Sequence, residues 1–299
     1  MAADESSRYR LSICIPTYNR DVYLESLLAR IAAEVEGRGD VQIVISDNAS
    51  TDRTPDVVAR WASRADFVCV RRETNGGAER NFLAVVEAAA GEYCWIFGDD
   101  DVLLPGGVAR VLALLGEHDP ELLHVSTETL PLVEQTTRFN GLAEFVEHFA
   151  RVQPRMLLDV TLVTAAIFRR SRWLSIPDKE RFIPTRYLHA LVIAESLRGG
   201  GRIVLVPDRV ISVRRERAAF AEHGIVREIP FLQLNYLLTL AALTGSDTLL
   251  RYCRRLRVSA LGGSARMFAR ETARYVRNAG AIVATGIRCL FAPRRGSAE

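Results

Sequence analysis

Short apolar runs alternate with segments of helical periodicity through the first hundred residues of the chain. Each run is rich in β-branched residues and is closed by proline or polar residues, as buried strands are; the runs cover residues 10–17, 41–46, 67–71 and 93–97. Residues 21–35 carry apolar side chains at the spacing of one helix face, and further helices are expected after Thr54 and over 80–90. This alternation predicts a mainly parallel sheet flanked by helices and joined by right-handed crossovers.

The second part of the chain carries scattered strand signals, and from residue 230 onward only helical patterns remain. Strands are expected at 122–127, 162–168, 203–206 and 210–213, and helices at 143–150, 187–197, 231–243, 247–261 and 265–277. We therefore expect one α/β domain over 11–225, divided into halves at 11–125 and 126–225. A disordered N-terminus at 1–10 and a helical, basic extension at 226–299 are expected on either side of it.

The composition is typical of a globular protein that folds inside the cell. Of 299 residues, 48% are hydrophobic and 25% are charged. The five cysteines show no C-x-x-C spacing, which argues against a disulfide framework and against a zinc ribbon. The first ten residues lack the apolar core of a signal peptide, and no uninterrupted run of ~18 apolar residues predicts a spanning helix. We expect a cytoplasmic protein.

Positive charge is concentrated near the C-terminus. Residues 251–299 contain eleven arginines and two acidic residues, a formal charge of +9, against +3 for the whole chain. A basic helix with an apolar face can lie in a membrane interface, so peripheral contact with the inner face of a membrane is one interpretation. A solvated face, or packing against the rest of the chain or a second subunit, is the other. No nucleic-acid-binding signature accompanies the arginines, so no nucleic-acid partner is expected.

Three adjacent carboxylates, Asp99, Asp100 and Asp101, follow the predicted strand at 93–97. Neighbouring carboxylates repel one another unless a cation lies between them. Hard oxygen ligands on one loop suit Mg²⁺ or Mn²⁺, and these ions also bind phosphate oxygens. The alternative is a helix N-cap in which the helix dipole favours the extra acids, because a helical pattern follows.

Two further polar loops follow predicted strands and are expected at the same sheet edge, where ligands of such sheets bind. At 47–52, Asp47 can accept a hydrogen bond from a base N–H or a ribose hydroxyl; the alternative is an Asx turn with Asp52 or Thr54 as a helix cap. At 75–81, the glycines allow close backbone approach and Arg80 can hold a phosphate. The alternative for this loop is a surface turn with a solvated arginine.

These motifs occur in an order that resembles a known enzyme family. The segments are SICIPTYNR (12–20), IVISDNASTDRT (43–54), NGGAERN (75–81) and GEYCWIFGDDDVLLPG (91–106). Together they resemble glycosyltransferase family 2, the inverting sugar transferases with the GT-A fold, over the chain up to about residue 115. ISDNASTD and WIFGDDD are most similar to the abequosyltransferase-like branch, which builds bacterial surface polysaccharides of the O-antigen or capsule kind.

The resemblance implies a nucleotide-diphosphate-sugar donor, bound by the half at 11–125, and a glycan or lipid-linked acceptor, bound by the half at 126–225. It also implies Mn²⁺ or Mg²⁺ as a cofactor. The residues that match the family's nucleotide-sugar-binding positions are Pro16, Thr17, Tyr18, Asp47, Asn48, Arg80 and Asp99. Asp99 and Asp101 match the two ends of the D-x-D motif and would hold the metal. Asp100 is its middle residue, which we group with the catalytic residues without a defined role.

The catalytic base is where this sequence departs from the resemblance. Many relatives carry a Glu-Asp pair before a helix in the second half, and this chain has none there. The matching stretch is 186–189, which makes His189 the candidate base, because an imidazole with a near-neutral pKa can accept a proton. The alternative is a half-buried structural histidine. Asp178 and Glu180 lie upstream in a loop-like stretch and are rival bases.

We therefore expect an inverting, metal-dependent glycosyltransferase of the hexosyltransferase type (EC 2.4). A non-catalytic nucleotide- or glycan-binding GT-A protein stays open because the Glu-Asp pair is missing. A nucleotidyltransferase is a further alternative, but it requires a glycine-rich loop with a basic residue near the first strand. The loop at 16–19 does not supply one.

Overall fold

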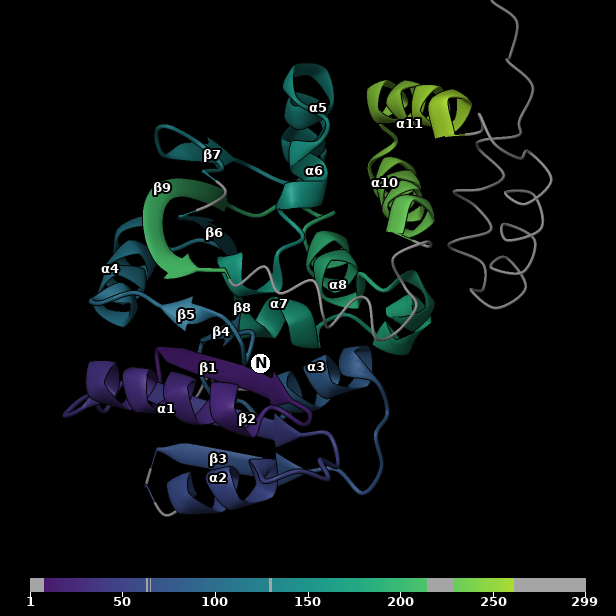
Figure 1. Cartoon of the computed structure of the whole chain (residues 1–299). Helices are drawn as coiled ribbons and strands as arrows, with labels where there is room; N and C mark the ends of the chain where they lie inside the picture. The colour runs from purple at the N-terminus through teal and green to yellow at the C-terminus, as the bar shows by residue number, and fades with distance from the viewer. Residues whose placement is uncertain (1–7, 63, 65, 129–130, 214–228, 261–299) are drawn as a thin grey trace, which may run out of the picture.

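The computed structural model describes residues 8–62, 64, 66–128, 131–213 and 229–260. Its centre is a sheet of nine strands in the order β3-β2-β1-β4-β8-β6-β9-β5, with β7 paired to β9. Helices cover both faces of this sheet (Figure 1). The predicted helix at 265–277 lies outside the described residues. The predicted disordered N-terminus at 1–10 also lies outside them, except for residues 8–10.

The first half has the expected order of strands and helices. Its strands are β1 (Leu11–Thr17), β2 (Val41–Asp47), β3 (Phe67–Arg71) and β4 (Tyr93–Ile96), and its helices are α1 (Asp21–Val35), α2 (Thr54–Trp61) and α3 (Ala78–Glu87). All neighbouring pairs among these strands are parallel. Every residue of β2 is buried, as a central parallel strand covered on both faces requires. The predicted parallel arrangement is therefore confirmed.

The chain after β4 mixes parallel and antiparallel pairing. Its strands are β5 (Val102–Leu103), β6 (Leu122–Thr127), β7 (Thr137–Phe139), β8 (Ala166–Arg169) and β9 (Ile203–Ser212). Its helices are α4 (Gly107–His118), α5 (Leu142–Val152), α6 (Met156–Asp159), α7 (Arg170–Leu174), α8 (Leu188–Ser196), α10 (Ile229–Thr244) and α11 (Asp247–Ala260), with 3-10 turns η1 (Val163–Ala165) and η2 (Lys179–Thr185). β8 lies between β4 and β6 in the sheet and runs antiparallel to both.

Two strand predictions were wrong in detail. The expected strand at 162–168 begins as η1, and only β8 from Ala166 is extended, because Thr164 bonds its carbonyl and hydroxyl to side chains outside a ladder. The expected strands at 203–206 and 210–213 are one strand, β9, which pairs with β6 through register shifts after Val125. Such irregular pairing accommodates the proline at 207 within the strand.

The core consists of two apolar layers, one on each face of the sheet. Ile13 and Ile15 of β1 belong to the apolar layer that includes residues of α1 and α4, whereas Cys14 between them belongs to the layer on the opposite face, which includes residues of α3, α5 and α8. The extension at α10 and α11 joins the second layer, since α10 packs on α5, α8 and η2 and α11 packs on α5. Within the described ranges, no helix is both long and apolar enough to cross a membrane.

Candidate active site

The carboxyl ends of the first-half strands bring several predicted residues together. Thr17, Asp47 and Arg71 are the last residues of β1, β2 and β3, and they stand opposite one another in the strand register. The Thr17 hydroxyl Oγ1 donates a hydrogen bond to Asp99 Oδ2 at 2.8 Å. The ends of β1 and β2 and the acidic triplet after β4 therefore form one polar edge, as predicted for the ligand-binding edge of such a sheet.

Asp47 is buried, and each of its two carboxylate oxygens accepts a hydrogen bond from a nearby group. Its Oδ1 accepts from the Ser50 backbone N–H at 3.0 Å, and its Oδ2 accepts from Arg71 Nη1 at 2.7 Å. Arg71 also donates to the Ser50 carbonyl at 3.0 Å, so it braces the whole loop. Sequence reasoning missed Arg71. The signal was its place as a charged residue at the end of a strand, level with Asp47.

Asn48 holds the neighbouring turn at 75–77. Its Nδ2 donates to Asn75 Oδ1 at 2.8 Å, and its Oδ1 accepts from the Gly76 N–H at 3.1 Å. Gly77 lies at a φ of 85°, a conformation that favours glycine, and α3 begins directly after it. The Asn48 amide is thus engaged in fixing the shape of the loop that carries Arg80.

The remaining first-half candidates lie around this edge with different exposure. Tyr18 is 38% exposed, whereas Pro16 is half-buried within β1. Arg80 is exposed, and its Nε lies 3.5 Å from Glu180 Oε1 of η2. This ion pair brings the rival base Glu180 to the α3 loop. The other rival, Asp178, precedes η2 in the left-handed conformation with a φ of 46°.

One carboxyl group of the acidic triplet, that of Asp99, has a strongly raised pKa. The pKa of Asp99 is raised to about 7, chiefly by burial and to a smaller extent by the negative charges of Asp100 and Asp101, against the opposing effects of the Thr17 hydrogen bond and the positive charge of Arg20. Arg20 is a second residue that sequence reasoning missed, although it closes the first quoted motif. A site whose carboxylates disfavour each other's ionisation is one that a bound cation would stabilise.

Asp101 is buried, and a residue from the second half of the chain holds its carboxylate. Thr164 Oγ1 donates to Asp101 Oδ2 at 2.5 Å, and the same hydroxyl accepts from the Gly98 N–H at 3.0 Å. A Cβ at Gly98 would lie 2.8 Å from Asp101 Oδ2, so a larger residue there would force the Asp101 carboxylate to shift. The helix-cap alternative is wrong for the triplet, because α4 begins at Gly107 after Gly106, with no side-chain cap.

The donor set suits Mn²⁺ or Mg²⁺ as an ion shared with a ligand. Across the described ranges, no group of three or more His, Cys, Asp or Glu side chains could hold a metal ion. These two ions, however, commonly bind to one or two carboxylates and take their other ligands from phosphate and water. Asp99 and Asp101 supply hard oxygen donors on one loop.

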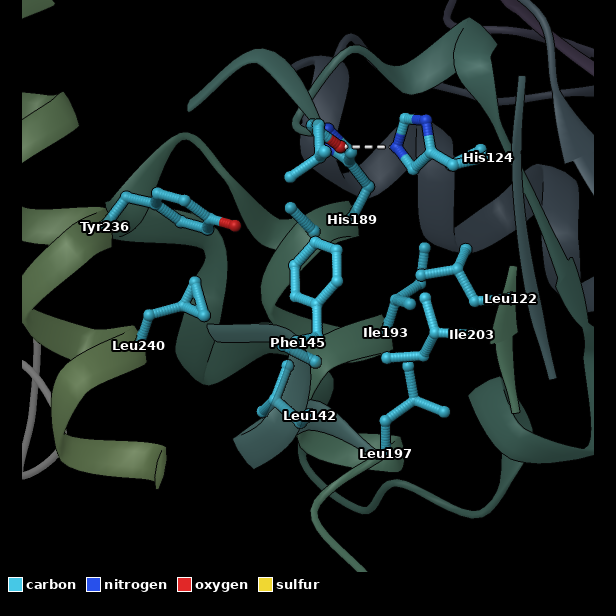
Figure 2. Close-up of a pocket in the computed structure, with 14 residues that line it drawn as sticks. Leu122, His124, Leu142, Phe145, His189, Ile193, Leu197, Ile203, Tyr236 and Leu240 are labelled. Carbon is cyan, nitrogen blue, oxygen red and sulfur yellow. Dashed lines mark hydrogen bonds between the residues drawn. The ribbon is translucent and has the colours of Figure 1, made fainter. Parts of the chain in front are cut away.

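His189 lies in α8, on the opposite face from α1, and lines a small apolar cavity. Its Nε2 donates to the Thr161 carbonyl at 2.7 Å, and its ring meets Phe82 edge-on at 5.5 Å. The cavity has a volume of about 40 Å³, and the side chains that line it include His124, Leu142, Phe145, Leu197, Tyr236 and Leu240. Figure 2 shows the two histidines at one end of this group and Leu142 and Leu197 at the other. None of the acidic triplet lines it.

The cavity contains a second histidine to which sequence reasoning assigned nothing. His124 Nε2 donates to the Val160 carbonyl at 2.7 Å, and burial lowers the pKa of His124 to about 4. Burial also lowers the pKa of His189. Both rings are therefore neutral near pH 7, and neither Nδ1 has a hydrogen-bond partner among the residues that the structure describes. No sequence spacing links these two histidines, because they meet only through the fold.

The mixed, mainly parallel sheet flanked by helices, with an acidic loop beyond its parallel strands, is an arrangement that solved structures of the GT-A fold share. The structure is similar to TarS 1–349 of Staphylococcus aureus in complex with UDP-GlcNAc, with a TM-score of 0.63 and 18% identity over 92% of this chain and 83% of that one. It is also similar to the mannosyltransferase PcManGT of Pyrobaculum calidifontis in complex with GDP-Man and Mn²⁺. That match has a TM-score of 0.54 and 17% identity over 97% of this chain and 88% of the other.

The sequence comparisons identify the family. The family described as Glycosyl transferase family 2 matches residues 12–171, more than half of the chain. The abequosyltransferase RfbV of Salmonella typhimurium is 30% identical over 235 residues, which are 73% of this chain and 71% of that protein. The chain therefore belongs to glycosyl transferase family 2, and the predicted GT-A fold is confirmed.

Proposed function

We propose that this glycosyltransferase moves a sugar from a nucleotide-diphosphate-sugar to a glycan or lipid-linked acceptor, with inversion, in the synthesis of a bacterial surface polysaccharide. The observation that carries the proposal is the convergence of Thr17, Asp47 and Asp99 at one sheet edge. The similarity to an abequosyltransferase supports the class of product, and the UDP-GlcNAc complex of TarS supports the class of donor.

In this proposal the first-half loops bind the nucleotide. Asp47 accepts from the base while Arg71 donates beside it, so the two present an acceptor and a donor side by side. Pro16, Thr17 and Tyr18 form the floor of the site, and Asn48 keeps the 75–77 turn in place. Arg80 binds the diphosphate, and for this it must release Glu180. Because that ion pair is exposed to solvent, breaking it costs little free energy.

Asp99 and Asp101 are the residues that would hold Mn²⁺ or Mg²⁺, and Asp99 also lies toward the ribose. When bound, the ion supplies positive charge that stabilises the departing nucleoside diphosphate. Asp100, half-buried between the two ligands, contributes negative charge to the loop and has no separate role in the proposal. The Mn²⁺ complex of PcManGT supports this choice of ion.

His189 is the base that we propose. Inversion requires a base on the side of the sugar opposite the leaving group, and the base must be unprotonated before transfer. The lowered pKa keeps the imidazole neutral, and the bond from Nε2 to Thr161 leaves Nδ1 as the proton acceptor. Glu180 is the rival, because its ion pair with Arg80 brings it to the donor loop.

We further propose that the basic extension contacts the inner face of the membrane, where a lipid-linked acceptor would be found. The sequence from 251 to 299 carries the formal charge of +9, and Arg251 and Arg255 of α11 are exposed. Anionic lipid attracts such a segment, and the attraction weakens with salt. Sedimentation with vesicles that contain anionic lipid, against neutral vesicles, tests this contact; equal binding to both would contradict it.

A thermal-shift panel tests the donor site. Nucleoside diphosphates and nucleotide sugars are each added with Mn²⁺, Mg²⁺ or EDTA. A ligand at 100 times its Kd stabilises the native state by about 2.7 kcal/mol, so one nucleotide class should raise the midpoint only with metal. Asp101→Asn should abolish the metal-dependent part. An EDTA-insensitive shift, or one retained in Asp101→Asn, contradicts the metal assignment. A folded protein that responds to no nucleotide contradicts the transferase proposal.

Two variants test the base and separate the enzyme from a binding protein. His189→Gln should retain the nucleotide-induced shift but lose transfer, measured as release of nucleoside diphosphate from the donor found in the panel. Glu180→Gln should retain both. The reverse result makes Glu180 the base. A wild-type protein that binds donor but releases no nucleotide with any acceptor glycan supports the non-catalytic alternative. Release of pyrophosphate would support nucleotidyl transfer.

A further inference from the structure

One short segment of the second half contacts both groups of candidate catalytic residues. The segment at 160–164 runs from the end of α6 into η1. The Val160 carbonyl accepts from His124, and the Thr161 carbonyl accepts from His189, each at 2.7 Å. Three residues further on, the Thr164 hydroxyl donates to Asp101. The segment therefore lies between the acidic loop and the buried histidines and is bonded to each.

Thr164 is held so that its hydroxyl proton has one destination. Its side chain is fully buried, and its carbonyl accepts from Trp95 Nε1 at 2.7 Å. The hydroxyl oxygen accepts from the Gly98 N–H at 3.0 Å, so its single proton goes to Asp101 Oδ2. Trp95 is itself fully buried in β4, which fixes Thr164 relative to the strand that ends in the acidic loop.

We infer that Thr164 is a positioning residue for the metal carboxylate Asp101. Its hydroxyl sets the rotation of the carboxylate before any ion binds, and the Thr161 carbonyl, three residues earlier in the same segment, orients the ring of His189. Substitution of a residue that orients a metal ligand in this way typically lowers the metal affinity roughly 10–100-fold. The inference rests on the proposed function, because it assumes that Asp101 holds the ion. It adds a residue from outside the quoted motifs, contributed by the other half of the chain.

Binding of Mn²⁺ alone to the metal-free protein tests this role, with the free ion measured by electron paramagnetic resonance. Thr164→Val removes the hydroxyl in a side chain of the same shape, and it should weaken Mn²⁺ binding roughly 10–100-fold. Thr164→Ser restores the hydroxyl and should return the Kd to within about threefold of wild type. Thr161→Val is the matched control, because its hydroxyl bonds only to the Leu158 carbonyl, at 2.6 Å, as far as the described residues show.

Comparison of wild type with these variants distinguishes a failure of this inference from a failure of the proposed function. Wild-type protein that takes up no Mn²⁺ even when a nucleoside diphosphate is added, or an Asp101→Asn variant that binds Mn²⁺ like wild type, overturns the metal site and this inference with it. Wild-type binding that Thr164→Val leaves unchanged, or that Thr161→Val weakens equally, overturns the inference alone. The thermal midpoint of each metal-free variant checks folding. Should Thr164→Val not fold, Thr164→Ala makes the same comparison without the added methyl group.

Discussion

At the scale of single residues, the candidate site is built from buried polar side chains that fix one another. Asn81 of α3 shows the pattern. Its Oδ1 accepts from Ser46 Oγ at 2.7 Å, and its Nδ2 donates to the carbonyls of Ser46 and Thr17 at 2.9 and 3.2 Å. One amide thus joins α3 to the ends of β1 and β2. Buried polar groups of this kind are costly to leave unpaired, so they specify one arrangement of the loops.

Asn81→Ala should therefore destabilise the fold and loosen the donor site together. Removal of the amide leaves the buried Ser46 hydroxyl without its acceptor and takes one donor from each of two buried carbonyls, which should lower the free energy of unfolding by about 2–3 kcal/mol. Urea denaturation measures this loss, and the nucleotide-induced thermal shift should shrink in parallel. Gln135→Ala removes an exposed amide and is the control. A loss below about 0.5 kcal/mol would mean that water replaces the amide at no cost.

At the scale of elements, α5 anchors the start of α11. Glu147 of α5 accepts hydrogen bonds from Ser246 Oγ and Thr248 Oγ1, each at 2.7 Å. Ser246 Oγ accepts in turn from the Leu249 N–H at 3.1 Å, so it also caps the helix. The two hydroxyl bonds lower the pKa of Glu147 to about 2, with a smaller contribution from Arg151. The ionised carboxylate is thus the form that joins the two helices.

This contact predicts a pH dependence of stability. Because the pKa of Glu147 is lowered in the folded state from its ordinary 4.5 to about 2, its contribution is complete above pH 4.5 and is lost as the pH falls toward 2. The difference in unfolding free energy between wild type and Glu147→Gln should shrink from pH 6.5 to pH 3.5 in urea titrations. Glu87→Gln, at an exposed position of α3, should show no such trend. A pH-independent difference would assign the stabilisation to packing.

At the scale of the whole molecule, the two halves are tied together at both ends of the sheet. Near the site, Arg186 lies 3.3 Å from the buried carboxylate of Glu79. At the opposite edge, the guanidinium groups of Arg10 and Arg169 lie 5.0 and 4.7 Å from the centre of the Tyr93 ring. Arg169 of β8 also donates to Tyr93 Oη at 2.6 Å. These contacts cross the β4–β8 junction, where the parallel part of the sheet meets the antiparallel part.

Arg169→Met should weaken that junction. The substitution keeps an apolar stem but removes the ion pair with Asp119 at 2.6 Å, the ion pair with Glu92 and the cation–π contact. We expect a loss of about 2 kcal/mol in unfolding free energy, part of which high salt should mimic in wild type. Arg198→Met breaks an exposed pair with Glu195 and should cost less than about 0.5 kcal/mol. Equal losses would mean that the contacts of Arg169 with Tyr93, Glu92 and Asp119 stabilise the fold no more than an exposed surface ion pair does.

The sequence predicts the parts of this molecule that depend on local pattern. β1 to β4 and α1 to α3 follow from periodicity, because each buries a face that its own residues define. β5 and β7, with two and three residues, carry too little pattern to be seen. The contact of Arg71 with Asp47 could have been inferred from strand register. The contact of Thr164 with Asp101 could not, because the two residues are 63 positions apart and no local feature distinguishes Thr164 from other residues of a strand-like run.

The position of β8 also determines the order in which a growing chain can complete its sheet. β3, β2, β1 and β4 can pair once Ile96 has been synthesised, but the free edge of β4 waits for β8, which begins at Ala166. At about 5–20 residues per second, a ribosome needs roughly 4–14 s for that stretch. During this interval an unpaired edge is available to other nascent chains. Thr164, the hydrogen-bond partner of Asp101, is synthesised only near the end of this interval. The acidic loop therefore reaches its final arrangement after the loops that follow β1 and β2.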